Sequence, residues 1–77
     1  MDMVELRALI ADAIDVDEED ITPNAHFMDD IGVDSLGSLE VLVRLERQLG
    51  IKIPESDLPR LVSLQEVMNY LSEIARK

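Results

Sequence analysis

The chain has 77 residues, no cysteine and a formal net charge of −10. Without cysteine it has no disulfide, no thiolate nucleophile and no cysteine-ligated zinc site. A chain of this length is expected to form one domain, residues 1–77, with a thin core. Aromatic residues make up only 3% of the chain, so this core has to consist of aliphatic side chains and methionine.

The negative charge is concentrated before Ser35. Residues 1–34 contain eleven acidic residues and one basic residue, whereas residues 35–77 contain six of each. An acidic surface of this kind aids solubility, repels nucleic acid and anionic lipid, and favours protein partners with basic surfaces. The N-terminus lacks the basic region of a signal peptide, and no apolar stretch has the length of a membrane span. We therefore expect a cytoplasmic protein, or one of a plastid or mitochondrion if a transit peptide has been removed, without nucleic-acid partners or membrane insertion.

The first predicted element is an amphipathic helix over residues 3–14, in which apolar side chains recur three or four residues apart. An acidic run and Pro23 then interrupt the helical pattern. Residues 15–34 are predicted to form a long but ordered loop with a short turn near Asp29, because apolar residues are spaced along it as anchors. These anchors are Val16, Ile21, Phe27, Ile31 and Val33.

The second predicted helix covers residues 35–49. Gly50 suits the left-handed position that ends many helices. One side of this helix is apolar, and the opposite side carries Glu40, Arg44 and Arg47. Glu40 and Arg44 are four residues apart and in the favourable order for an ion pair.

After this helix the chain is predicted to be extended, because Ile53 precedes a proline. Pro54 can be the first residue of a short third helix, Glu55–Leu58, whose length Pro59 limits.

The last predicted helix covers residues 64–75 and begins with the capping-box pattern of Ser63 and Glu66. No strand alternation and no internal repeat are present. The sequence therefore predicts an all-α fold: a small four-helix bundle with three long helices, one short helix and a long first loop.

Catalysis by this chain alone is not expected. His26 is the only histidine, and a serine triad would need it beside Ser35 with an acid behind it. Ser35 also lacks the G-x-S-x-G surroundings of a nucleophile elbow. We interpret His26 as a loop residue next to Phe27.

Asp15, Asp17 and Asp20 resemble the start of a calcium-binding loop, but the EF-hand template does not fit. Asp20 stands where the template needs glycine, and His26 stands where it needs glutamate. We interpret the acidic segment as a solvated turn that attracts divalent cations only loosely.

Ser35 is the residue with the clearest functional potential. Free N–H groups at a helix start point outward and the helix dipole favours negative charge, so a phosphate ester would be stable on this hydroxyl. Alternatively, Asp34 or Ser35 is a simple helix cap. These considerations leave both interpretations open, and of the two they favour the cap.

The segment FMDDIGVDSLGSLEVLVRLERQLGIKIPESDL resembles the signature of acyl carrier proteins. That family has F-x-D-D-L-G-x-D-S-L, then a helix with apolar and acidic residues, then an I-x-I-P link. DEEDITPNAHF and SLQEVMNYL are similar to the family's first loop and last helix. The residues that carry the main match are Phe27, Asp29, Asp30, Ile31, Gly32, Asp34, Ser35, Leu36, Glu40, Leu45, Glu46, Ile51, Ile53 and Pro54.

The resemblance implies that Ser35 carries 4′-phosphopantetheine as a phosphodiester. A separate phosphopantetheinyl transferase of the holo-ACP synthase type would attach it from coenzyme A, with Asp34 and Leu36 in its recognition signature. The arm's thiol would hold acyl groups as thioesters for ketosynthases, acyltransferases or acyl ligases of fatty-acid, polyketide or related pathways. The carrier is expected to be a monomer. Because its core has almost no rings, we hypothesise that the interior opens to shelter an acyl chain.

The second helix departs from the pattern of fatty-acid carriers, in which it is typically rich in acids. Arg44 and Arg47 stand on its exposed side, and Val43 replaces a bulkier contact that is often methionine. We predict partners with mixed or partly acidic docking surfaces, unless the arginines only balance neighbouring glutamates. Gly37 is unusual in the first turn of a helix. It either gives the transferase or the arm close access to the backbone, or it reflects neutral drift. The predicted partner-binding residues are Leu36, Glu40, Val43, Arg44, Glu46 and Arg47.

Two alternatives remain at this point. One is a carrier of amino acids, including D-alanine, although peptidyl carriers more often have G-G-x-S and Asp34 disfavours that form. The other is a helical interaction module without the cofactor, in which Ser35 only begins a helix.

Overall fold

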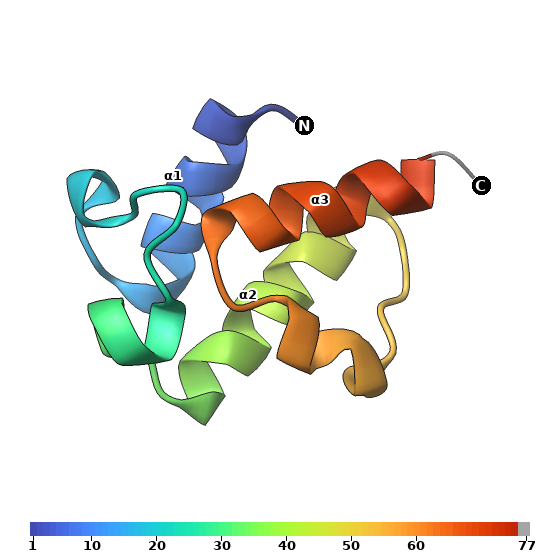
Figure 1. Cartoon of the computed structure of the whole chain (residues 1–77). Helices are drawn as coiled ribbons and strands as arrows, with labels where there is room; N and C mark the ends of the chain where they lie inside the picture. The colour runs from blue at the N-terminus through green and yellow to red at the C-terminus, as the bar shows by residue number, and fades with distance from the viewer. Residues whose placement is uncertain (76–77) are drawn as a thin grey trace.

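The computed structural model describes residues 1–75 and contains three α-helices, α1 (Met3–Ile14), α2 (Ser35–Leu49) and α3 (Leu64–Ala75). α1 packs against both α2 and α3, and the long first loop closes one end of the bundle (Figure 1). The helix bounds agree with those predicted from the sequence, and residues 1–75 contain no β-strand. The all-α class is confirmed. None of the described helices is long and apolar enough to cross a membrane.

Each long helix begins with a side-chain cap. Asp2 and Glu5 form a capping box at α1, in which the Glu5 N–H donates to the Asp2 carboxylate at 2.8 Å; the sequence analysis did not identify this cap. At α3 the Glu66 N–H donates to Ser63 Oγ at 3.2 Å, as the capping pattern predicts. Gly50 ends α2 with φ 64°, the predicted left-handed conformation.

The first loop is ordered by two short helical turns, η1 (Glu18–Asp20) and η2 (Phe27–Ile31). η2 is a single wide turn of the π type and includes the turn predicted near Asp29. Loops of this length in compact domains are normally pinned to their surroundings. Here the Phe27 N–H donates to the Val62 carbonyl at 2.7 Å, which fixes η2 against the segment that leads into α3.

The short third helix begins at Glu55, as predicted, but ends at Arg60 rather than at Leu58. It is a 3₁₀-helix, η3 (Glu55–Arg60), with Pro54 as its extended N-cap rather than its first residue. Pro59 does not end it, because the backbone bonds divide it into two tight turns: the Asp57 N–H donates to Pro54, and the Leu61 N–H donates to Leu58. Pro59 occupies the second position of the later turn, where a fixed φ is favourable and no N–H is needed.

The core is aliphatic, as the composition requires. All three α-helices supply side chains without measurable exposure, and Phe27 adds the one large ring from the loop at 2% exposure. Burial of such side chains stabilises the fold by about 25 cal/mol for each Å² of apolar surface removed from water. The helical residues at 0% exposure are Leu6, Ile10, Leu45, Leu64 and Val67.

Candidate functional site

Asp34, and not Ser35, caps the start of α2. Its carboxylate accepts the Gly37 N–H at 2.8 Å, and its carbonyl accepts the Ser38 N–H at 3.1 Å. Ser35 is therefore the first residue inside the helix, and its side chain is exposed to solvent. Because Asp34 provides the cap, the hydroxyl of Ser35 is free for chemistry.

The backbone around this hydroxyl favours an anion. No residue between 1 and 75 accepts the N–H groups of Ser35 and Leu36, which belong to the unpaired first turn of a 15-residue helix. Unpaired N–H groups and the positive end of the helix dipole stabilise a phosphate at this position.

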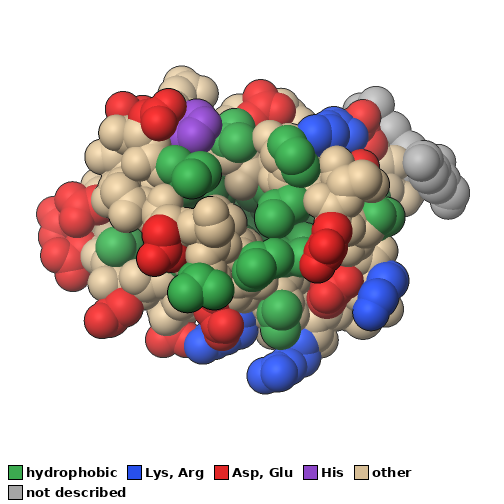
Figure 2. Space-filling model, turned by 90° about the horizontal axis from the view of Figure 1, so that it is seen from below, with side chains coloured by type: hydrophobic (Ala, Val, Ile, Leu, Met, Phe, Trp, Pro, Cys, Tyr) green, Lys and Arg blue, Asp and Glu red, His purple; other side chains and the backbone are tan. Residues whose placement is uncertain are grey.

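Ser35 also lies at the edge of an apolar groove. The groove has a volume of about 580 Å³ and is bounded by η2, the first turns of α2, and η3 with the residues that follow it. Figure 2 shows apolar side chains gathered at the centre of this face, with carboxylates at its left side. The lining residues are His26, Phe27, Met28, Ser35, Ser38, Leu39, Glu55, Leu58, Pro59, Leu61 and Val62.

The comparisons with known proteins agree with this geometry. Residues 4–71 match the protein family described as "Phosphopantetheine attachment site". Polyketide-8 synthase acyl carrier protein 2 from Streptomyces avermitilis is 42% identical over 94% of this chain and 83% of its own length. An acyl carrier protein from Thermosynechococcus vestitus is 34% identical over 88% of this chain and 84% of its own length. The chain belongs to the acyl carrier protein family.

Membership in the acyl carrier family implies a covalently attached 4′-phosphopantetheine. It also implies interaction with a phosphopantetheinyl transferase and with acyl-transferring enzymes. Acyl carrier proteins are carriers and not catalysts. The residues present fit the group, because an exposed hydroxyl lies beside unpaired N–H groups and beside an apolar groove.

The η2 turn holds the start of α2 in place. Gly32 follows the turn with φ 86°, a conformation that favours glycine. The Val33 N–H then donates to the Phe27 carbonyl at 2.7 Å. Phe27 is itself buried and bonded to Val62, so these contacts hold the residues before α2 in place.

Gly37 has a packing role that the sequence did not reveal. A Cβ at this position would lie 2.7 Å from Cγ1 of Val33 and 3.5 Å from Cγ2 of Ile14. Val33 is 8% exposed and its branched side chain has little freedom to move away. Glycine is thus needed for the close approach of the loop and the end of α1 to the first turn of α2.

The predicted partner-binding residues separate into two groups. Leu36, 75% exposed, and Val43, 41% exposed, lie with Glu40 and Arg47 along one outward stripe of α2. We call these four residues the α2 stripe. The side chain of Glu46 instead accepts the Ile53 N–H at 2.7 Å and so holds the link after α2.

Arg44 is bound within the carrier itself. Its guanidinium contacts the Asp12 carboxylate at 2.7 Å and the Glu40 carboxylate at 3.3 Å, which joins α1 to α2. The hydrogen bond to Asp12, followed by that to Glu40, raises the pKa of Arg44 above its usual value. The Glu40–Arg44 pair was predicted from the sequence, whereas Asp12 is 32 residues away and could not be.

His26 is more than a neighbour of Phe27. Its Nδ1 accepts the N–H groups of Met28 and Asp29, each at 3.2 Å, so the imidazole ring caps the η2 turn. This role was not predicted from the sequence, because capping by histidine has no simple pattern.

In the acidic segment, residues 18–20 form η1. Within residues 1–75, no group of three or more acidic or histidine side chains could hold a metal ion.

Proposed function

We propose that Ser35 is the attachment residue and that this carrier presents acyl groups on its arm to acyl-transferring enzymes. The main support is the free, exposed hydroxyl of Ser35 in the first turn of α2, where Asp34 already provides the cap. When bound, 4′-phosphopantetheine supplies the thiol that the chain lacks. In attachment, the Ser35 oxygen forms the phosphodiester and loses its proton, and the nucleotide part of coenzyme A leaves.

The chain's own residues have three tasks in this function. Asp34 keeps the helix start rigid, the N–H groups of Ser35 and Leu36 stabilise the phosphodiester, and Leu36 offers an exposed contact to the transferase. The groove beside Ser35 is the proposed shelter for the acyl chain, since its lining is mainly apolar and it begins at the attachment residue.

A loading assay tests this function. The purified chain is incubated with coenzyme A and a broad-specificity phosphopantetheinyl transferase, and its intact mass is measured. We expect the mass to increase by one phosphopantetheine, with the modified peptide containing Ser35. An unchanged mass would favour the helical interaction module instead. A cytoplasmic, monomeric carrier is part of the same proposal.

For the pathway, we favour polyketide or another specialised acyl transfer over primary fatty-acid synthesis. The support is the Streptomyces avermitilis relative, which is named as a polyketide synthase carrier, together with the two arginines on α2. Loading of the holo-protein with acyl, malonyl and D-alanyl groups by candidate ligases and acyltransferases would distinguish polyketide, fatty-acid and aminoacyl carriers.

The α2 stripe is the proposed docking surface for ketosynthases, acyltransferases or acyl ligases, with Arg47 as its cation. Arg47 is exposed, and no carboxylate among residues 1–75 forms an ion pair with it. Replacing Arg47 with glutamine should lower the association rate with such an enzyme about twofold to fivefold, because one exposed charge pair is lost.

Arg44→Gln is the matched control for Arg47→Gln. It removes the same charge from the same helix, but Asp12 and Glu40 already bind that guanidinium, so its effect on association should be smaller. Stopped-flow binding at low and high salt measures both variants. Equal rates for Arg47→Gln and the unchanged protein would contradict an acidic docking partner.

A further inference from the structure

We infer that two side-chain contacts between η3 and α3, Asp57 with Tyr70 and Arg60 with Glu73, form a clamp that sets the length of acyl chain the groove accepts. This inference rests on the proposed function, because it assumes an acyl chain carried at Ser35. It concerns residues of η3 and α3, away from Ser35, and assigns them a role in cargo specificity.

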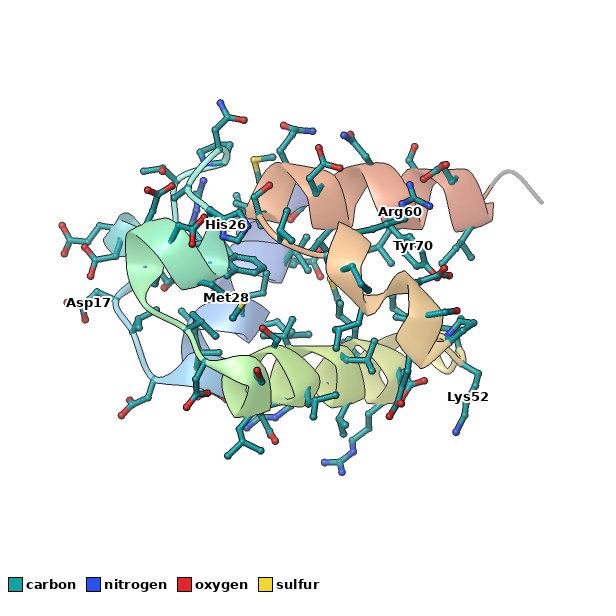
Figure 3. All side chains as sticks on the ribbon, turned by 60° about the horizontal axis from the view of Figure 1, so that its bottom comes forward. Asp17, His26, Met28, Lys52, Arg60 and Tyr70 are labelled. Carbon is teal, nitrogen blue, oxygen red and sulfur yellow. The ribbon has the colours of Figure 1, made fainter. Side chains whose placement is uncertain are left out.

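The contacts of the clamp join one face of η3 to α3. The Tyr70 hydroxyl donates to the Asp57 carboxylate at 2.6 Å. Arg60 forms a hydrogen-bonded ion pair with Glu73, and its guanidinium lies 5.1 Å from the centre of the Tyr70 ring. Figure 3 shows the side chains of Arg60 and Tyr70 together between η3 and α3. All four side chains therefore act between the same two elements.

The opposite face of η3 forms one wall of the groove. Glu55, Leu58 and Pro59 come from η3 itself, and the chain that follows adds further lining residues. Figure 3 shows Met28 on the side of η2 that faces this wall. The width of the groove thus depends on where η3 lies relative to α2 and η2.

Among the walls of the groove, η3 depends most on side-chain contacts for its position. None of its residues is buried, and it is a short 3₁₀ element with weak internal bonding. The other walls are more firmly held: α2 is a 15-residue helix with Leu45 at 0% exposure, and η2 is fixed by Phe27. α3 is an equally firm support for the clamp, because Leu64 and Val67 are at 0% exposure.

Within the clamp, the Tyr70–Asp57 bond is the stronger part. Tyr70 is 6% exposed, whereas Arg60 and Glu73 are both on the surface, where ion pairs are weakened by solvent and salt. The hydrogen bond to Asp57, together with burial, raises the pKa of Tyr70 to about 12. The hydroxyl therefore stays protonated and donates at neutral pH, and the bond is lost only as pH rises through the raised pKa.

The test compares chain-length profiles of the unchanged protein and Tyr70→Phe. This variant keeps the ring beneath Arg60 and removes only the hydroxyl. Both proteins are loaded from hexanoyl-, decanoyl- and tetradecanoyl-coenzyme A by a broad-specificity transferase. The rate of thioester cleavage by hydroxylamine, which forms the hydroxamate and releases the thiol, then reports how well each chain is sheltered.

We expect the two proteins to react alike with the hexanoyl group. Tyr70→Phe should protect the tetradecanoyl thioester about threefold better, because η3 can move outward once one hydrogen bond is absent. Amide chemical shifts of Leu58 and Leu61 should change further with chain length in the variant than in the unchanged protein. Asp57→Ala should behave like Tyr70→Phe, whereas Asp57→Asn, which keeps an oxygen acceptor, should restore the original profile.

Identical profiles for Tyr70→Phe and the unchanged protein would overturn the clamp. A uniform change at all three chain lengths would also overturn it, because that result indicates general loosening. Failure of the proposed function is distinguishable, since in that case no protein would gain the mass of the arm.

Discussion

Replacing Ser35 with alanine should abolish loading with phosphopantetheine. The oxygen that forms the phosphodiester is removed. The chain has no cysteine, and the next hydroxyl along α2, that of Ser38, is half-buried three residues further on. Intact mass after incubation with coenzyme A and transferase should show full conversion of the unchanged chain and none of the variant. The variant should still fold, because Ser35 is exposed and Asp34 provides the cap; its unfolding free energy should change by no more than about 0.5 kcal/mol.

Ser38→Ala is the matched control for this experiment. Ser38 lies about one turn further along α2 and lines the same groove, but it is half-buried and lies beyond the free N–H groups of the helix start. It should load as the unchanged chain does. Loading of Ser35→Ala, or loss of loading in Ser38→Ala alone, would contradict the assignment of the attachment residue.

Replacing Phe27 with alanine should lower the free energy of unfolding by about 3 to 5 kcal/mol. Phe27 is the largest of the fully buried side chains, so its removal leaves a large cavity in the core. Domains of this size have total stabilities on the order of 5 to 10 kcal/mol, so the loss is a large part of the whole. Because Phe27 also bonds Val62 and Val33, the segment leading to Ser35 should lose its fixed position.

Met28→Ala is the control, since Met28 is the next residue in the same turn but is 49% exposed. Its replacement should cost less than about 1 kcal/mol. Urea unfolding of both variants, followed by far-UV circular dichroism, measures the difference. Similar midpoints for the two variants would show that η2 contributes little to the core and would contradict the role given to Phe27.

The long helices were predictable because their signals are local. These signals act within a few residues of the bounds they determine. They are the periodic apolar residues, Gly50 after α2 and the Ser63–Glu66 pattern before α3. Ser35 was proposed as the attachment residue in the same way, through the short pattern around it. The predicted end of η3 was wrong, because a proline's effect depends on the type of turn in which it lies, and two tight turns accommodate Pro59 without an N–H.

The sequence by itself therefore determined the all-helical fold, the bounds of its three long helices and the serine at the start of α2. Only the tertiary structure decided which side chains meet across elements. Arg44 binds Asp12 of α1, Tyr70 binds Asp57 of η3, and Gly37 leaves room for Val33. The physical reason is the range of the interactions. Capping and periodicity depend on neighbours in the chain. The groove, the clamp and which of Arg44 and Arg47 is bound within the protein depend on how whole elements pack.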